Sequence, residues 1–113
     1  MSVIDIAKSH FENLGVQSIE VPEWKDEHGN STIIYWNPIN LSEKNILFKK
    51  SDNLSDVSIL ADILVMKALD KDGKKLFKPE DKVALMYKVD SDVLSRISTA
   101  MVSAITPDEV KKN

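Results

Sequence analysis

The feature that most constrains this 113-residue chain is a segment, residues 54–69, that has helical periodicity and is apolar on nearly every side. Only a narrow polar stripe interrupts it: Ser55, Ser58 and Asp62. Its apolar side chains occupy one face and most of the remaining circumference: Val57, Ile59, Leu60, Ile63, Leu64, Val65 and Met66. Such a helix either forms the centre of a core or offers part of its surface to another protein. In a small domain the core role is favoured, with the other elements packed around this helix.

The composition is that of an ordinary globular domain, with 42% apolar and 29% charged residues. A chain of this length forms one domain and can bury a core without cross-links. We assign residues 1–106 to this domain and expect residues 107–113 to be a flexible tail. The absence of cysteine excludes disulfides and thiolate metal ligands, and two histidines alone do not suggest a zinc site.

Targeting signals are not recognisable in the sequence. The first residues lack the basic start and the long apolar stretch of a secretion signal. The most apolar run, residues 57–69, is too short to span a bilayer and contains Asp62 and Lys67. We therefore expect a cytoplasmic protein with no membrane partner.

The N-terminal third predicts a helix followed by a β-hairpin. Ser2 and Gly15 are suited to cap a helix over about residues 3–14, with one apolar face: Ile4, Ala7, Phe11 and Leu14. Residues 18–21 then alternate in polarity, and Pro22 marks that strand as an edge strand. Gly29-Asn30 signals a turn before the β-branched and aromatic run 32–36. An isolated hairpin is marginally stable, so we expect it to pack on the helices.

Three further helices are predicted from their starts. Asn40 and Glu43 have the spacing of a capping box for a helix to about Lys50, with Ile46 and Leu47 buried. Pro79 is suited to the first turn of the next helix, whose buried face we predict from three residues: Val83, Met86 and Tyr87. Asp90 or Ser91 caps a last helix, which ends before Pro107. Five residues of this helix share its predicted buried side: Val93, Ile97, Ala100, Met101 and Ala104. The fold class is therefore α+β and mainly helical, with an N-terminal β-hairpin packed on four to five helices.

No residue pattern indicates catalysis or a cofactor. The segment 70–74 resembles a calcium loop, but Lys74 stands where that loop needs an acidic or amide residue, so a polar turn between helices is favoured. His10 and His28 are isolated and are expected to be solvated, and there is no glycine-rich phosphate loop. We therefore predict a protein that is not an enzyme, with no catalytic, cofactor-binding or metal-binding residues.

Aromatic and apolar side chains are the better candidates for contact with a partner. The predicted hairpin carries three large aromatic residues: Trp24, Tyr35 and Trp36. One side of a short hairpin cannot bury all three, so one of them is available as an interface anchor. Core packing is favoured for at least two of them. Ile59 and Met66 belong to the surplus apolar surface of residues 57–69. These five residues form the predicted partner-binding set.

Two motifs in this order carry a family resemblance. Residues 19–24, Ile-Glu-Val-Pro-Glu-Trp, resemble a "V-P-E-W" motif, and residues 69–81 are similar to a "D-x-D-G-K-x-L-F-x-x-E-D" segment that links two helices. Both are found in tail assembly chaperones of phages with long, non-contractile (siphovirus-type) tails. The resemblance extends over residues 15–105 and includes an "L…L…I" pattern: Leu85, Leu94 and Ile97. The chain departs from that family at residues 35–38, where many members have a "V-R-E-L-T" type stretch.

The resemblance implies a non-enzymatic late protein of virion assembly in the host cell cytoplasm. Such chaperones bind the tape measure protein, keep it soluble, help recruit tail tube subunits and are absent from the mature virion. Many are made in two lengths by ribosomal frameshifting, and the A-rich codons possible for residues 111–113 are compatible with a slippery site. The longer form then recruits the tail tube protein. Self-association into a homo-oligomer is also compatible with the surplus apolar surface.

The alternative function, from another class, is a small phage-encoded regulator that binds nucleic acid. A net charge of −3 and a pI near 5.3 weigh against it, as does the lack of a basic helix face. We therefore expect no nucleic-acid partner.

Overall fold

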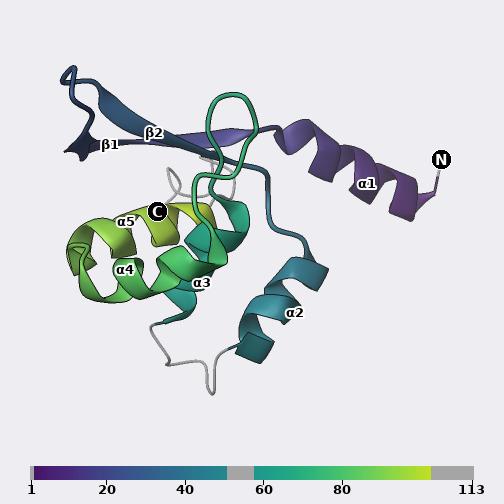
Figure 1. Cartoon of the computed structure of the whole chain (residues 1–113). Helices are drawn as coiled ribbons and strands as arrows, with labels where there is room; N and C mark the ends of the chain where they lie inside the picture. The colour runs from purple at the N-terminus through teal and green to yellow at the C-terminus, as the bar shows by residue number, and fades with distance from the viewer. Residues whose placement is uncertain (1, 51–57, 103–113) are drawn as a thin grey trace.

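The computed structural model describes residues 2–50 and 58–102 of the chain. In this part, helix α1 precedes a two-stranded hairpin, and the remaining helices follow it (Figure 1). The elements are α1 (Val3–Leu14), β1 (Gln17–Lys25), β2 (Ser31–Trp36), α2 (Leu41–Lys50), α3 (Ile59–Lys67), the 3₁₀-helix η1 (Pro79–Asp81), α4 (Lys82–Tyr87) and α5 (Ser91–Val102). The predicted α+β, mainly helical fold class is confirmed.

The hairpin is antiparallel, and its register runs from the pair Gln17–Trp36 to the pair Val21–Thr32. A bulge follows Val21, at the position where Pro22 has no N–H to donate to a ladder. The turn is closed by Asp26, whose Oδ1 accepts hydrogen bonds from two backbone N–H groups of the turn, at 2.8 and 2.9 Å. The alternation of residues 18–21 and the β-branched and aromatic run 32–36 therefore predicted both strands, although β1 continues past Pro22 to Lys25.

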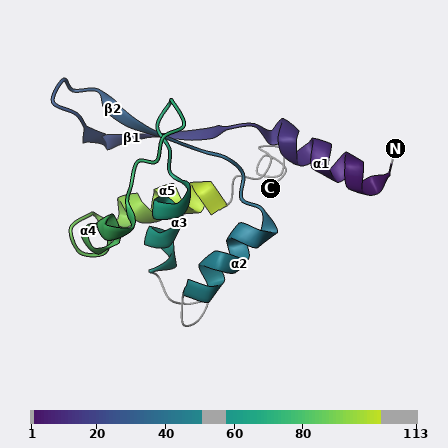
Figure 2. The same cartoon turned by 45° about the vertical axis from the view of Figure 1, so that its right-hand side comes forward.

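Helix α1 projects away from the rest of the molecule (Figure 1 and Figure 2). Its bounds agree with the prediction, and the Ser2 hydroxyl accepts a hydrogen bond from the backbone N–H of Asp5. Gly15 follows with φ 67° and ψ −175°, a backbone conformation that is almost restricted to glycine. The Gln17 side-chain amide donates to the Leu14 carbonyl at 2.9 Å and so satisfies one terminal acceptor of the helix. This geometry sends α1 outward along the line of β1.

Helix α3 lies at the centre of the core, as its apolar circumference predicted. It packs against α5, α2 and α4, and α5 in turn packs against β1. The buried apolar residues come from these elements, from β2 and from the residue after α3: Val21, Ile34, Trp36, Leu47, Ala61, Ile63, Leu64, Ala68, Leu85, Val93, Leu94, Ile97 and Met101. The hairpin thus packs on the helices through α5 and does not rest on α1.

The prediction that the central helix reaches Leu69 is wrong, because α3 ends at Lys67. Leu69 is extended and exchanges two backbone hydrogen bonds with Tyr35, at 2.7 and 2.9 Å. The following residues turn back at Gly73, whose φ is +84°, and residues 68–76 cover the outer edge of β2. Pairing with a strand edge therefore ends the helix before its apolar pattern does. The predicted beginning of this helix, residues 54–57, lies outside the described residues.

Two predicted faces are also corrected. In α2, Leu47 is buried but Ile46 is exposed. In α4, the predicted inner residues Val83, Met86 and Tyr87 are all exposed, and Leu85 is the buried one, at 4% exposure. Both helices are short and carry apolar residues on more than one side, so periodicity alone did not identify the buried side.

The last helix begins as predicted, with the Asp90 carboxylate accepting a hydrogen bond from the backbone N–H of Val93 at 3.1 Å. Val93, Ile97 and Met101 are buried, while Ala100 is half-buried. The predicted positions of Ala104 and Pro107, like the tail 107–113, lie outside the described residues.

Candidate partner-binding surface

Helix α1 carries an exposed apolar face. No residue of this helix is buried, and Val3 and Ile4 are 81% and 62% exposed. Ile6 and Phe11 are also exposed, as is Val16 just after the helix. Ile4, Ala7 and Phe11 lie on one side because they are spaced three and four residues apart. The helix is therefore amphipathic, and its apolar side faces solvent instead of the core.

A second apolar surface is a groove of about 350 Å³ between α2, α3 and α5. Its walls are mostly aliphatic and aromatic: Ile39, Lys44, Leu47, Phe48, Ile59, Leu60, Ile63, Ser98, Thr99 and Val102. Phe48 is exposed on the α2 side of the groove, and Leu41 and Ile46 expose more apolar surface on the same helix. A groove of this volume and lining is suited to apolar side chains of a ligand or partner.

The α2 wall of this groove is held by two sets of polar contacts. Asn40 and Glu43 form the predicted capping box, with hydrogen bonds of 2.8 and 3.1 Å. The other oxygen of Glu43 accepts a hydrogen bond from Lys67 of α3 at 2.8 Å. Burial alone would raise the pKa of Glu43, but the hydrogen bonds from Lys67 and from the Asn40 N–H outweigh it and lower that pKa. The Glu43 carboxylate therefore takes part in the N-terminal cap of α2 and also links α2 to the central helix α3.

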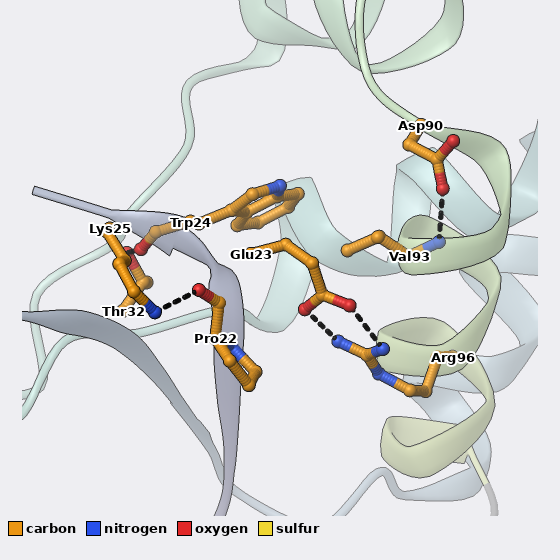
Figure 3. Close-up of polar contacts among 8 residues, drawn as sticks. All are labelled: Pro22, Glu23, Trp24, Lys25, Thr32, Asp90, Val93 and Arg96. Carbon is orange, nitrogen blue, oxygen red and sulfur yellow. Dashed lines mark hydrogen bonds and ion pairs between the residues drawn. The ribbon is translucent and has the colours of Figure 1, made fainter.

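The hairpin is held to α5 by an ion pair at the surface. Figure 3 shows the Glu23 carboxylate facing the Arg96 guanidinium, with both oxygens bonded. Trp24, the next residue, is half-buried and packs against the core, and its carbonyl accepts a hydrogen bond from the Thr32 hydroxyl at 2.7 Å. The ion pair therefore links the hairpin to α5, while the bond between Thr32 and Trp24 joins the two strands to each other.

The five predicted partner-binding residues do not share one surface in the structure. Trp36 is 2% exposed and belongs to the core. Trp24, Ile59 and Met66 are half-buried and pack against it, and Tyr35 is half-buried where β2 pairs with Leu69. Of the five, Ile59 is among the residues that line the groove. Core packing of at least two of the aromatics agrees with the expectation.

The amphipathic pattern of α1 was visible in the sequence, but its exposure was not. The same spacing is typical of a helix packed on its own domain. In the folded chain, none of the residues of α1 is buried, and the sequence pattern does not reveal this. The exposed residues of α2, Leu41 and Phe48, were likewise missed because apolar residues are normally taken as core.

Polar side chains that were weighed for chemistry have structural or solvated positions. Asp70 Oδ1 accepts hydrogen bonds from the backbone N–H groups of Asp72 and Lys74, at 2.8 and 3.0 Å, and the Lys74 N–H contributes most to a lowered Asp70 pKa. This is the predicted polar turn. His10 and His28 are exposed. Within residues 2–50 and 58–102, no group of three or more His, Asp or Glu is arranged to hold a metal ion.

None of the helices in the described part of the chain is long and apolar enough to cross a membrane. Comparison of the chain with protein families, with curated proteins and with solved structures finds no match.

Proposed function

We propose that this chain is a tail assembly chaperone of phages with long, non-contractile tails, acting by binding and not by catalysis. Its client is the tape measure protein, which it keeps soluble in the host cytoplasm while tail tube subunits are recruited. It leaves before the virion matures, and a longer frameshifted form carries the contact with the tube protein.

The observation that carries this proposal is the exposed apolar face of α1. A helix of twelve residues is marginally stable in water unless its apolar face is covered. Exposed apolar patches rimmed by polar residues mark sites of protein contact. A chaperone for extended helical segments needs such a face, because an amphipathic client helix buries its own apolar stripe against it.

The groove between α2, α3 and α5 supports the same function. Phe48 and Ile59 offer apolar contact area, and Lys44 at its edge offers a charge that orients an approaching chain. Grooves of this kind accept side chains spaced three and four residues apart along a partner helix. The molecule thus has two apolar surfaces suited to one class of client.

The test is co-expression with the tape measure protein encoded in the same genome, followed by affinity purification and size-exclusion chromatography. We expect the tape measure protein to be insoluble alone and to elute in a soluble complex with this chain. If the tape measure protein remains insoluble and nothing co-elutes, the proposed function is wrong for this chain by itself.

A further inference from the structure

Asp62 is a charged residue in the core, although its sequence context marked it as part of a polar stripe. It is 5% exposed, and its Oδ1 lies 3.0 Å from the ammonium of Lys82 in α4. The other oxygen, Oδ2, is buried and has no hydrogen-bond partner within the part of the chain that the structure describes. A buried carboxylate oxygen left without a donor is costly, so this ion pair is only half satisfied.

The carboxylate lies at a pocket of about 300 Å³. Four residues line it: Asp62 and Val65 from α3, and Pro79 and Lys82 from the segment η1–α4. Two apolar side chains thus stand beside a carboxylate whose present partner is a lysine. The Lys82 side chain is 35% exposed, so its ammonium can leave Asp62 and become solvated without unpacking α3.

We propose that this pocket binds an arginine side chain of a partner protein, with the guanidinium replacing Lys82 on Asp62. A guanidinium offers paired N–H groups in a fixed fork, and so bonds both oxygens of a carboxylate at once. Lys82 bonds only Oδ1. The apolar stem of the arginine then packs against Val65 and Pro79.

The chemistry of the pocket selects arginine over other basic or amide side chains. If a lysine of the partner entered the pocket, its ammonium would only replace that of Lys82, and Oδ2 of Asp62 would still lack a donor. A glutamine amide lacks the positive charge that compensates a buried carboxylate. Of the four residues that line the pocket, Asp62 is the one that carries a carboxylate. Asp81 lies nearby in the sequence, but its carboxylate accepts a hydrogen bond from the Lys78 N–H at 2.7 Å.

This inference goes beyond the proposed function, because it does not depend on which protein presents the arginine. The test is an NMR titration of the full chain with N-acetyl-arginine-methylamide, and with the lysine and glutamine analogues at the same concentrations. We expect saturable shifts of the backbone amides of residues 62, 65 and 82 with the arginine probe, and binding at least about fivefold weaker with the other two.

Two variants sharpen the test. Lys82→Gln removes the competing charge and keeps a hydrogen-bond donor for Asp62, so we expect it to bind the arginine probe several-fold more tightly. Lys88→Ala removes a charge next to the same helix, outside the pocket, and we expect it to bind as the wild type does. The inference is overturned if the arginine probe causes no saturable shift at residues 62, 65 and 82, if the lysine analogue binds equally well, or if Lys82→Gln binds no more tightly than Lys88→Ala.

Discussion

The carboxylate of Glu23 and the guanidinium of Arg96 are joined by two hydrogen bonds, of 2.6 and 2.8 Å. The pair connects strand β1 to helix α5, elements that lie far apart in the sequence (Figure 3). The hydrogen bond from Arg96 is the main reason that the pKa of Glu23 is lowered to about 2. Both side chains are partly exposed, so solvent screens the pair, and its main effect is to orient the hairpin.

This lowered pKa predicts a pH dependence of stability. A carboxyl group with a lower pKa in the folded than in the unfolded state stabilises the fold above its unfolded value, here 4.5, and this contribution is lost as the pH falls from 4.5 through about 2. We expect Glu23→Gln to lower the free energy of unfolding at pH 7 and to differ less from the wild type as the pH approaches 2. Urea unfolding at several pH values measures this, with Glu20→Gln on the same strand as control. An equal difference at pH 7 and at pH 2 would contradict it.

The orientation of α4 is tested by a pair of truncations. Leu85 is buried, so we expect Leu85→Ala to lower the free energy of unfolding by about 2–5 kcal/mol. Tyr87 is 80% exposed, so Tyr87→Ala is expected to change it by about 0.5 kcal/mol or less. Thermal or urea unfolding of both variants measures this. In the orientation that periodicity suggested, Tyr87 is buried, so Tyr87→Ala would cause the large loss and Leu85→Ala the small one; that result would contradict the structure.

The attachment of α2 to α3 depends on Glu43. Glu43→Gln keeps an acceptor for the Asn40 N–H but leaves the buried ammonium of Lys67 without its carboxylate. Removing one partner of a buried ion pair costs about 3–5 kcal/mol. Because the Glu43 carboxylate is partly exposed, we expect Glu43→Gln to lower the free energy of unfolding by about 3 kcal/mol, the lower end of that range. We expect the double variant Glu43→Gln/Lys67→Met to regain most of that loss in urea unfolding. A double variant no more stable than the single one would show that the charge of Lys67 is not what makes the loss costly.

We expect Gly15 to set the direction of α1 and to contribute little to the stability of the core. Gly15→Ala places a Cβ on a backbone conformation that is strained by about 1–3 kcal/mol for other residues. Because no residue of α1 is buried, we expect the strain to be relieved by reorientation of the helix, with little change in the unfolding midpoint. Residual dipolar couplings of α1 relative to α5 measure this. An unchanged direction of α1 accompanied by a clear loss of stability would contradict it.

Local signals in the sequence predicted much of the fold. Asn40 with Glu43, Pro79 and Asp90 each mark a helix start, because each supplies or spares a hydrogen bond at the first turn. The first strand was predicted from the alternation of residues 18–21, which places Val21 on the core side. The second was predicted from its β-branched and aromatic residues, among them the buried Ile34.

The remaining features depend on contacts between distant segments. The burial of Asp62 rests on Lys82 from another helix, and the end of α3 rests on pairing between Leu69 and Tyr35. The candidate surface was predicted least well, because an amphipathic helix such as α1 has the same pattern whether its apolar face meets its own core or faces solvent. Only the folded chain shows that Ile4 is exposed while Trp36 is not.

The most direct test of the chaperone function is the tape measure co-expression repeated with variants of α1. Ile4→Lys/Phe11→Lys adds two charges to the apolar face, and Ser9→Lys/Asn13→Lys adds the same two to another side of the helix. Because α1 has no buried residue, neither change is expected to disturb the core. Loss of two apolar anchors should weaken binding at least about tenfold. We therefore expect the control to recover a soluble complex as the wild type does, and the face variant to lose it. Equal recovery of the tape measure protein by both variants would contradict the role of α1 as the client-binding face.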